Sequence, residues 1–204
     1  MRKLLAGSLV VLAAFVLAPL IRAESVSKVS LQSPTPVFEY RLLATKKTST
    51  LEEELNEAAD AGFRFQGVMG GDTSWGGSEV VAVLSRSDGG EPGRYQYKLL
   101  AANRTGTMQN EAQEAADAGY TYVGQTVFTS TFGGREIVLI VERDVEFEPV
   151  RYEIKLLATS RTGTMQEELL EAGAAGFEFV GLTVASTTFG GSELVSIMAR
   201  RLPQ

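Results

Sequence analysis

One sequence pattern occurs three times in this chain, at a constant spacing of 57 residues. Equivalent positions keep their residues: Leu42, Leu99 and Leu156 correspond, as do Gly62, Gly119 and Gly176. A fixed period near 50 residues indicates structural modules that stack on their neighbours. We therefore expect three tandem units, called repeat 1 (residues 38–88), repeat 2 (residues 95–145) and repeat 3 (residues 152–202).

Each repeat begins with a predicted strand and continues into a predicted helix. Tyr95, Tyr97 and Leu99 alternate with polar residues, which is typical of a half-buried strand. In repeat 1 a helix follows with one apolar stripe, formed by Leu51, Leu55, Ala58 and Ala59. Thr50 with Glu53, and Thr164 with Glu167, have the capping-box spacing, so we expect these threonines to be the N-caps. The glycines at 62, 119 and 176 are expected to end the helices in a left-handed conformation.

Two more strands are expected after each helix, joined at an aromatic-Gly-Gly sequence. The last strand of repeat 2 contains the apolar run at residues 137–141, which needs cover on both faces. The third strand is therefore placed in the centre of its sheet, antiparallel to both neighbours. The predicted fold class is α+β: three tandem βαββ units with mainly antiparallel sheets, each carrying one helix.

The repeated motifs resemble those of a known family. They read Y-x-[YI]-K-L-L-A in repeats 2 and 3, A-G-[YF]-x-[YF] after each helix, and [WF]-G-G-x-E before each last strand. This pattern is similar to the small βαββ modules of a bacterial domain family of unknown function, over residues 38–202. The resemblance implies the fold and brings no activity, cofactor or catalytic residue.

The N-terminus has the pattern of an export signal. Arg2 and Lys3 precede an apolar run at residues 4–21, and Ala23 ends a plausible cleavage site. We expect residues 1–23 to be a cleaved signal peptide and residues 24–37, which are rich in Ser and Pro, to be a flexible tether. The expected location is the periplasm or the extracellular space. The alternative is an uncleaved anchor, which would make the protein a membrane-tethered envelope structural protein.

Composition excludes several function classes. Without Arg2, Lys3 and Arg22 the chain has 16 basic and 25 acidic residues, a net charge of −9, which argues against nucleic acid and anionic membranes as partners. The sequence contains neither His nor Cys, which removes the common nucleophilic triads and the usual zinc and haem ligand sets. We expect no cofactor and no metal site, and we locate no paired catalytic groups.

The loops before the second and third helices are candidate anion sites. They place Arg104, Thr105 and Thr107, and likewise Arg161, Thr162 and Thr164, at a helix N-terminus, where free N–H groups favour phosphate, sulfate or carboxylate. Helix capping and turn formation alone also explain these residues.

The aromatic residues before the glycine turns are candidate contacts for a glycan, a peptide or a protein. They are Trp75, Phe132 and Phe189. The alternative is that each ring folds back over its own hairpin.

These observations favour an exported, non-enzymatic interaction or ligand-binding module. Its partner would be a protein, a glycan or a small anionic ligand. The alternative is a small-molecule binder or enzyme with a cleft between repeats, using Tyr, Glu and Arg groups.

Overall fold

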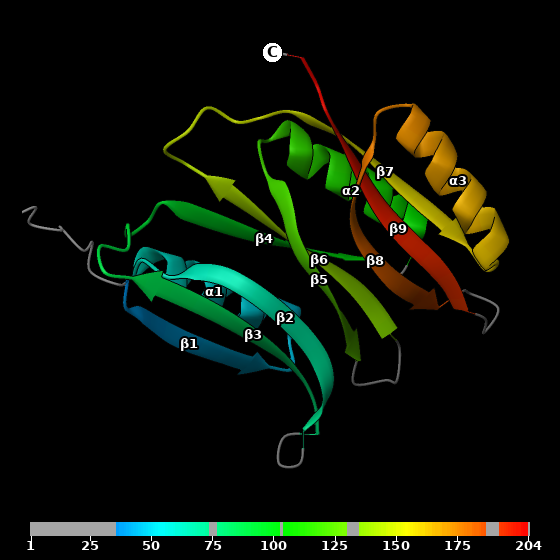
Figure 1. Ribbon diagram of the computed structural model, residues 1–204. Helices are drawn as coiled ribbons and strands as arrows, with labels where there is room; N and C mark the ends of the chain where they lie inside the picture. The colour runs from blue at the N-terminus through cyan, green and yellow to red at the C-terminus, as the bar shows by residue number, and fades with distance from the viewer. Residues whose placement is uncertain (1–35, 74–76, 103, 130–134, 187–191, 204) are drawn as a thin grey trace, which may run out of the picture. The chain divides into compact units, whose positions relative to one another are not determined.

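Every repeat folds into the predicted β-α-β-β unit in the computed structural model, which describes residues 36–73, 77–102, 104–129, 135–186 and 192–203 (Figure 1). Repeat 1 consists of β1 (Phe38–Thr45), α1 (Thr48–Asp60), β2 (Arg64–Thr73) and β3 (Gly77–Ser87). Repeat 2 consists of β4 (Tyr95–Ala102), α2 (Thr105–Asp117), β5 (Thr121–Thr129) and β6 (Arg135–Asp144). Repeat 3 consists of β7 (Tyr152–Thr159), α3 (Thr162–Ala174), β8 (Glu178–Ser186) and β9 (Ser192–Arg201).

The three repeats form three separate three-stranded sheets. Their strand orders are β1-β3-β2, β4-β6-β5 and β7-β9-β8, so the last strand of each repeat is central, as predicted. All six strand pairs are antiparallel. Because it has a neighbour on each edge and packing on each face, β6 buries four consecutive apolar residues, Val138 to Val141.

The helix α1 has the predicted apolar stripe, and all three helices have the predicted end. In α1 the buried residues are Leu51, Leu55, Ala58 and Ala59. The chain then leaves the helix through Gly62, whose φ is +84°. The equivalent glycines at 119 and 176 have φ values of +85° and +83°. A left-handed residue at this position is accessible to glycine at little steric cost, which explains why all three copies have it.

The predicted N-caps, Thr50 and Thr164, are wrong by three residues. The helices begin at Thr48, Thr105 and Thr162, and the preceding residues, Lys47, Arg104 and Arg161, are the N-caps, without a side-chain capping bond. Thr50 and Thr164 therefore lie inside the first turn. In repeats 1 and 3 a threonine at the end of the preceding strand makes the turn instead, because Thr45 Oγ1 accepts a bond from Lys47 N, and Thr159 Oγ1 accepts one from Arg161 N.

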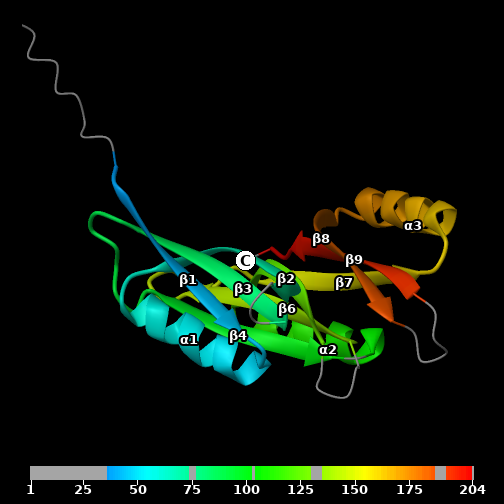
Figure 2. The ribbon, with the colours of Figure 1, turned by 90° about the horizontal axis from the view of Figure 1, so that it is seen from below.

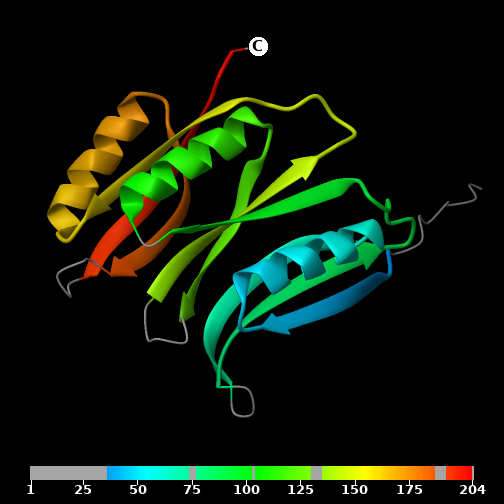
Figure 3. The same cartoon turned by 180° about the vertical axis from the view of Figure 1, so that it is seen from behind.

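Each helix of repeats 1 and 2 contacts two sheets. α1 packs on its own sheet and against β4 of the next repeat, and α2 does the same with β7 (Figures 2 and 3). One buried cluster accordingly combines Leu55 and Leu84 of repeat 1 with Ile140 of repeat 2. A second cluster combines Met108 of repeat 2 with Ile197 of repeat 3. Shared cores of this kind stabilise modules that are too small to be stable alone.

Residues 36–204 belong to one compact unit. None of the helices that the structure describes is long and apolar enough to span a bilayer. The predicted signal segment, residues 1–23, lies outside the described residues.

Candidate functional site at the junctions between repeats

At both junctions, amide side chains of a helix form hydrogen bonds with backbone N–H and C=O groups of the next repeat. At the junction of repeats 1 and 2, the Asn56 amide accepts a bond from Tyr97 N (2.9 Å) and donates one to Tyr97 O (3.0 Å). At the junction of repeats 2 and 3, Gln113 bonds Ile154 N (2.8 Å) and Tyr152 O (3.1 Å). The strands β4 and β7 are edge strands, so these amides pair backbone groups that no strand pairs.

An aromatic ring from one repeat also sits on a glycine of the next. A register shift in β2 between Phe65 and Gly67 has a counterpart in β5 and in β8. The Phe65 ring lies 3.0 Å from where a side chain on Gly124 would begin. At the same position of a side chain on Gly181, the Tyr122 hydroxyl oxygen lies at 2.5 Å and the nearest ring carbon at 2.8 Å. Only a glycine leaves room for these rings, so the ring and the glycine together fix how adjacent repeats meet.

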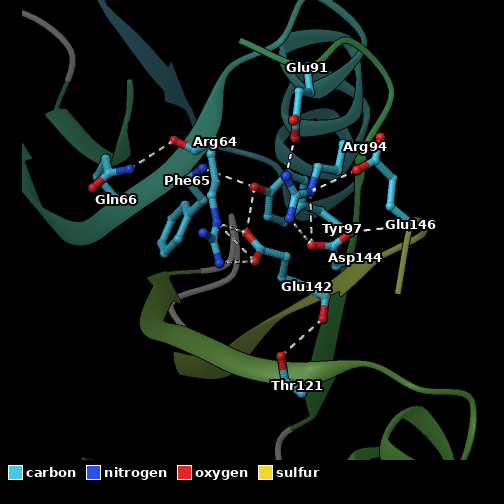
Figure 4. Close-up of polar contacts among 10 residues, drawn as sticks. All are labelled: Arg64, Phe65, Gln66, Glu91, Arg94, Tyr97, Thr121, Glu142, Asp144 and Glu146. Carbon is cyan, nitrogen blue, oxygen red and sulfur yellow. Dashed lines mark hydrogen bonds and ion pairs between the residues drawn. The ribbon is translucent and has the colours of Figure 1, made fainter. Parts of the chain in front are cut away.

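An ion pair between a half-exposed guanidinium and a buried carboxylate fills the first junction. The Arg64 guanidinium donates to both carboxylate oxygens of Glu142, with its closest nitrogen at 2.8 Å (Figure 4). The Glu142 side chain is 5% exposed, whereas that of Arg64 is 53% exposed. The Tyr97 hydroxyl donates to Glu142 Oε2 at 2.8 Å and accepts a bond from Phe65 N at 2.9 Å. We call Arg64, Tyr97 and Glu142 the junction triad.

Burial and hydrogen bonding shift two pKa values within the junction triad. Burial raises the pKa of the Tyr97 hydroxyl, and this effect outweighs the lowering by the Phe65 N–H. The hydrogen bonds to Glu142 raise the pKa of the Arg64 guanidinium further above its ordinary value. Arg64 is therefore a permanent cation and Tyr97 a neutral donor, an arrangement that neutralises a carboxylate rather than activating it.

A second ionic group surrounds Arg94 beside the triad. Arg94 bonds Asp144 Oδ2 and pairs with Glu91 and Glu146 (Figure 4). Burial alone would raise the pKa of Asp144, but the bonds from Arg94 and from the Glu146 N–H outweigh burial and lower it. This group ties the connector between repeats 1 and 2 to the end of β6.

A cleft of about 410 Å³ lies next to these groups and is lined by Arg64, Arg86 and Arg94 together with Tyr95. Each of its three arginines already has a carboxylate partner: Glu142 for Arg64, Glu39 for Arg86, and Asp144 for Arg94. An anion entering this cleft would compete with these internal carboxylates. We therefore do not assign it as an anion site.

The second junction has a cleft where the first has its triad. The positions of Arg64, Tyr97 and Glu142 are taken in the next repeat by Thr121, Ile154 and Ala199. These three residues line a cleft of about 400 Å³ between repeats 2 and 3. Smaller side chains at equivalent positions thus leave open the volume that the triad fills at the first junction.

The walls of this second cleft combine aromatic and charged side chains. The lining residues are Tyr120, Thr121, Tyr122, Tyr152, Ile154, Glu178, Val180, Ala199 and Arg201. Burial raises the pKa of the Tyr120 and Tyr122 hydroxyls, so both remain neutral donors at physiological pH. Glu178 and Arg201 are exposed, and among the described residues neither makes a side-chain hydrogen bond or ion pair. The lining of the cleft therefore combines one free carboxylate and one free guanidinium with the apolar side chains of Ile154, Val180 and Ala199.

The predicted anion sites are not assembled into one place. Arg104 and Thr107 are exposed, and so are Arg161 and Thr162, while Thr164 is half-buried. Thr105 donates its hydroxyl proton to Glu193 Oε1 of repeat 3 at 2.9 Å. The Thr105 hydroxyl, which was predicted to bind an external anion, is thus bonded to a carboxylate of the protein itself. In this structure Thr105 connects two repeats.

The predicted aromatic contacts, Trp75, Phe132 and Phe189, lie outside the described residues. The cleft residues Glu178 and Arg201 and the junction triad were not identified from the sequence. Comparison of the three copies contained a signal for Glu142, because it occupies the position of Ser85 in repeat 1 and Ala199 in repeat 3.

Comparison of the chain with protein-family models, with curated proteins and with solved structures gave no match. Within the residues that the structure describes, no three acidic side chains are grouped so that they could hold a metal ion. The geometry of the junctions is therefore the basis for inferring a function.

Proposed function

We propose that the protein is an exported, non-enzymatic ligand-binding protein whose site is the cleft between repeats 2 and 3. The single observation behind the proposal is the contrast between the two junctions. The first is filled by the chain's own guanidinium, phenol and carboxylate, and the second is open at the same positions. Its volume is in the range of small-molecule sites, which are mostly apolar with a few placed polar groups.

The lining favours a small amphipathic ligand that has both a cationic and an anionic group. Ile154, Val180 and Ala199 offer apolar surface for one ring. Among the other lining residues, Glu178 matches an ammonium and Arg201 matches a carboxylate, with the bidentate geometry that guanidinium groups favour. We propose binding without chemistry, because Glu178 is the one carboxylate in the lining and makes no hydrogen bond to another lining side chain.

Phenylalanine is a suitable first probe because it has one ring, one ammonium and one carboxylate. Isothermal titration of the full-length protein is expected to give saturable 1:1 heat. Phenethylamine keeps only the ammonium and 3-phenylpropionate only the carboxylate, so the two analogues separate the charged contacts. Glu178→Gln is expected to weaken phenethylamine about tenfold, and Arg201→Gln to weaken phenylpropionate about tenfold.

Two exposed residues outside the cleft provide matched control substitutions. Glu171→Gln and Lys46→Gln each remove one charge, as the cleft substitutions do, at exposed positions that do not line the cleft, and they should leave binding unchanged. Absence of heat with all three probes, together with native mass spectra of host-purified protein without any bound molecule, would contradict the proposal. Equal weakening by the control variants would show that net charge, rather than the cleft, attracts the probes.

A further inference from the structure

Adjacent repeats pack through two different, complementary faces: the rear of one repeat and the front of the next. In the described part of the chain, one rear face and one front face have no partner. The rear of a repeat provides a helix and a ring from its second strand. The front of the next repeat provides an edge strand and a bulge glycine. Within the described residues no repeat precedes repeat 1, so its front has no partner there. None follows repeat 3 among them either, so the rear of repeat 3 is also unpaired.

The front of repeat 1 exposes what the other repeats bury. Tyr40 is 70% exposed, whereas its equivalents Tyr97 and Ile154 are 2% and 8% exposed. Next to it, Leu42 is 64% exposed. Gly67 is the equivalent of Gly124, and a Cβ atom added to it would meet nothing within 4 Å. The place that a ring occupies in repeats 2 and 3 is therefore open in repeat 1.

The rear of repeat 3 exposes the matching parts. Phe179 is 57% exposed, although its equivalent Phe65 is 7% exposed and lies on Gly124. Leu170 on α3 is 65% exposed, at the position of Asn56 and Gln113. α3 buries only Met165 and Ala172, whereas α1 and α2 bury four residues each, because no following strand covers α3. Stacked-repeat proteins normally end in repeats with a polar outer face, and these two ends are apolar.

We propose that the rear of repeat 3 binds the front of repeat 1 of a second copy, so that copies of this chain associate head to tail. The contact continues the packing that the chain already makes twice. Phe179 sits on Gly67 of the second copy, as Phe65 sits on Gly124. Leu170 covers Tyr40 and the neighbouring Phe38, both of which are exposed aromatic residues.

Part of the polar pairing is also available at this contact. Gln109 of α2 accepts a bond from Leu156 N (2.7 Å) and donates one to Ile154 O (2.7 Å). Gln166 of α3 is its equivalent and is exposed, so it can pair with Leu42 N and Tyr40 O of the second copy. At the next helical turn Leu170 replaces the amide, and the contact there is apolar. The two faces differ from each other, so the interface is heterologous and leads to a ring or an open chain of copies.

Two substitutions block one face each without touching the core. Gly67→Leu fills the open space on the front, at a glycine whose φ is outside the left-handed region. Phe179→Arg puts a charge on the exposed ring position of the rear. Sedimentation velocity of the protein purified in the form that the cell produces is expected to show concentration-dependent association. Each variant alone should associate at least about thirtyfold more weakly, as expected for loss of a central aromatic anchor.

Mixing the two variants tests the head-to-tail geometry directly. The Gly67→Leu protein keeps an intact rear and the Phe179→Arg protein keeps an intact front. An equimolar mixture should therefore form a 1:1 dimer that goes no further, with circular dichroism confirming that both variants are folded. The proposal is overturned if the unmodified chain stays monomeric at all concentrations, if either variant associates as the unmodified chain does, or if the mixture of folded variants stays monomeric.

Discussion

The substitution Arg64→Thr gives the first junction the residue found at the equivalent position of the second junction, Thr121. Glu142 would lose all three contacts with the guanidinium, at 2.8, 3.1 and 3.3 Å, and keep the Tyr97 hydroxyl. Removal of one partner of a buried ion pair costs about 3–5 kcal/mol. Since the Arg64 side chain is 53% exposed, water can approach the carboxylate after the substitution. We therefore expect a loss of about 2–3 kcal/mol in the free energy of unfolding.

Substitution of Glu142 by Ala should relieve that penalty. The single substitution Glu142→Ala removes a buried hydrogen-bond acceptor and leaves the Arg64 guanidinium free to be hydrated. It should lower the free energy of unfolding by about 1–2 kcal/mol. In the Glu142→Ala background the guanidinium has no buried partner to lose, so Arg64→Thr should cost less than about 0.5 kcal/mol. The double-mutant cycle is therefore expected to give a coupling of about 2 kcal/mol.

Equilibrium unfolding in urea, followed by circular dichroism, measures all four proteins of this cycle. Equal m-values across the set would show that the same surface is exposed on unfolding. Arg200→Thr is the matched control, because Arg200 pairs with Glu153 where both side chains are about 40% exposed, and it should cost about 1 kcal/mol or less. Additive single effects, within about 0.5 kcal/mol, would refute the assignment of a coupled buried pair.

Two further predictions follow from the junctions. Burial raises the pKa of the Tyr97 hydroxyl, so below about pH 10 this hydroxyl is protonated in both the folded and the unfolded chain, and above about pH 10 it loses its proton in the unfolded chain first. The free energy of unfolding should therefore fall as the pH rises above about 10. Urea unfolding of Tyr97→Phe should show a smaller loss of stability over the same pH range. Gln113→Leu should cost about 1–2 kcal/mol in urea unfolding because it leaves Ile154 N and Tyr152 O without their partner, whereas the reverse change at the exposed equivalent position, Leu170→Gln, should stay within about 0.5 kcal/mol. Equal costs at the two positions would contradict the edge-pairing argument.

The fold of each repeat could be predicted because its signals lie close together in the sequence. The stripe from Leu51 to Ala59 and the C-terminal Gly62 are readable within one helix, and both are confirmed. The apolar run of β6 required a central strand, which is also confirmed. The helix starts were wrong because Thr45, at the end of the strand, makes a local bond to Lys47 that competes with the capping box at Thr50.

The junctions could not be predicted in the same way. Arg64 and Glu142 are 78 positions apart, and no periodicity within a repeat relates them. A pattern shared by three copies describes what the copies have in common, which is the interior of one module. The residues that join modules are those at which the copies differ, such as Glu142 against Ser85 and Ala199.

That difference between copies also explains why the second cleft stays open. Loss of the triad at one junction would ordinarily be compensated by collapse of the surrounding side chains. Here Tyr122 cannot move inward, because its ring lies on Gly181 and its hydroxyl donates to Gln125. On the other side, Ile154 belongs to a strand whose backbone is held at both N and O by glutamines of α2. The contacts that align repeats 2 and 3 thus hold the walls apart, so the proposed ligand would not have to move either sheet on binding.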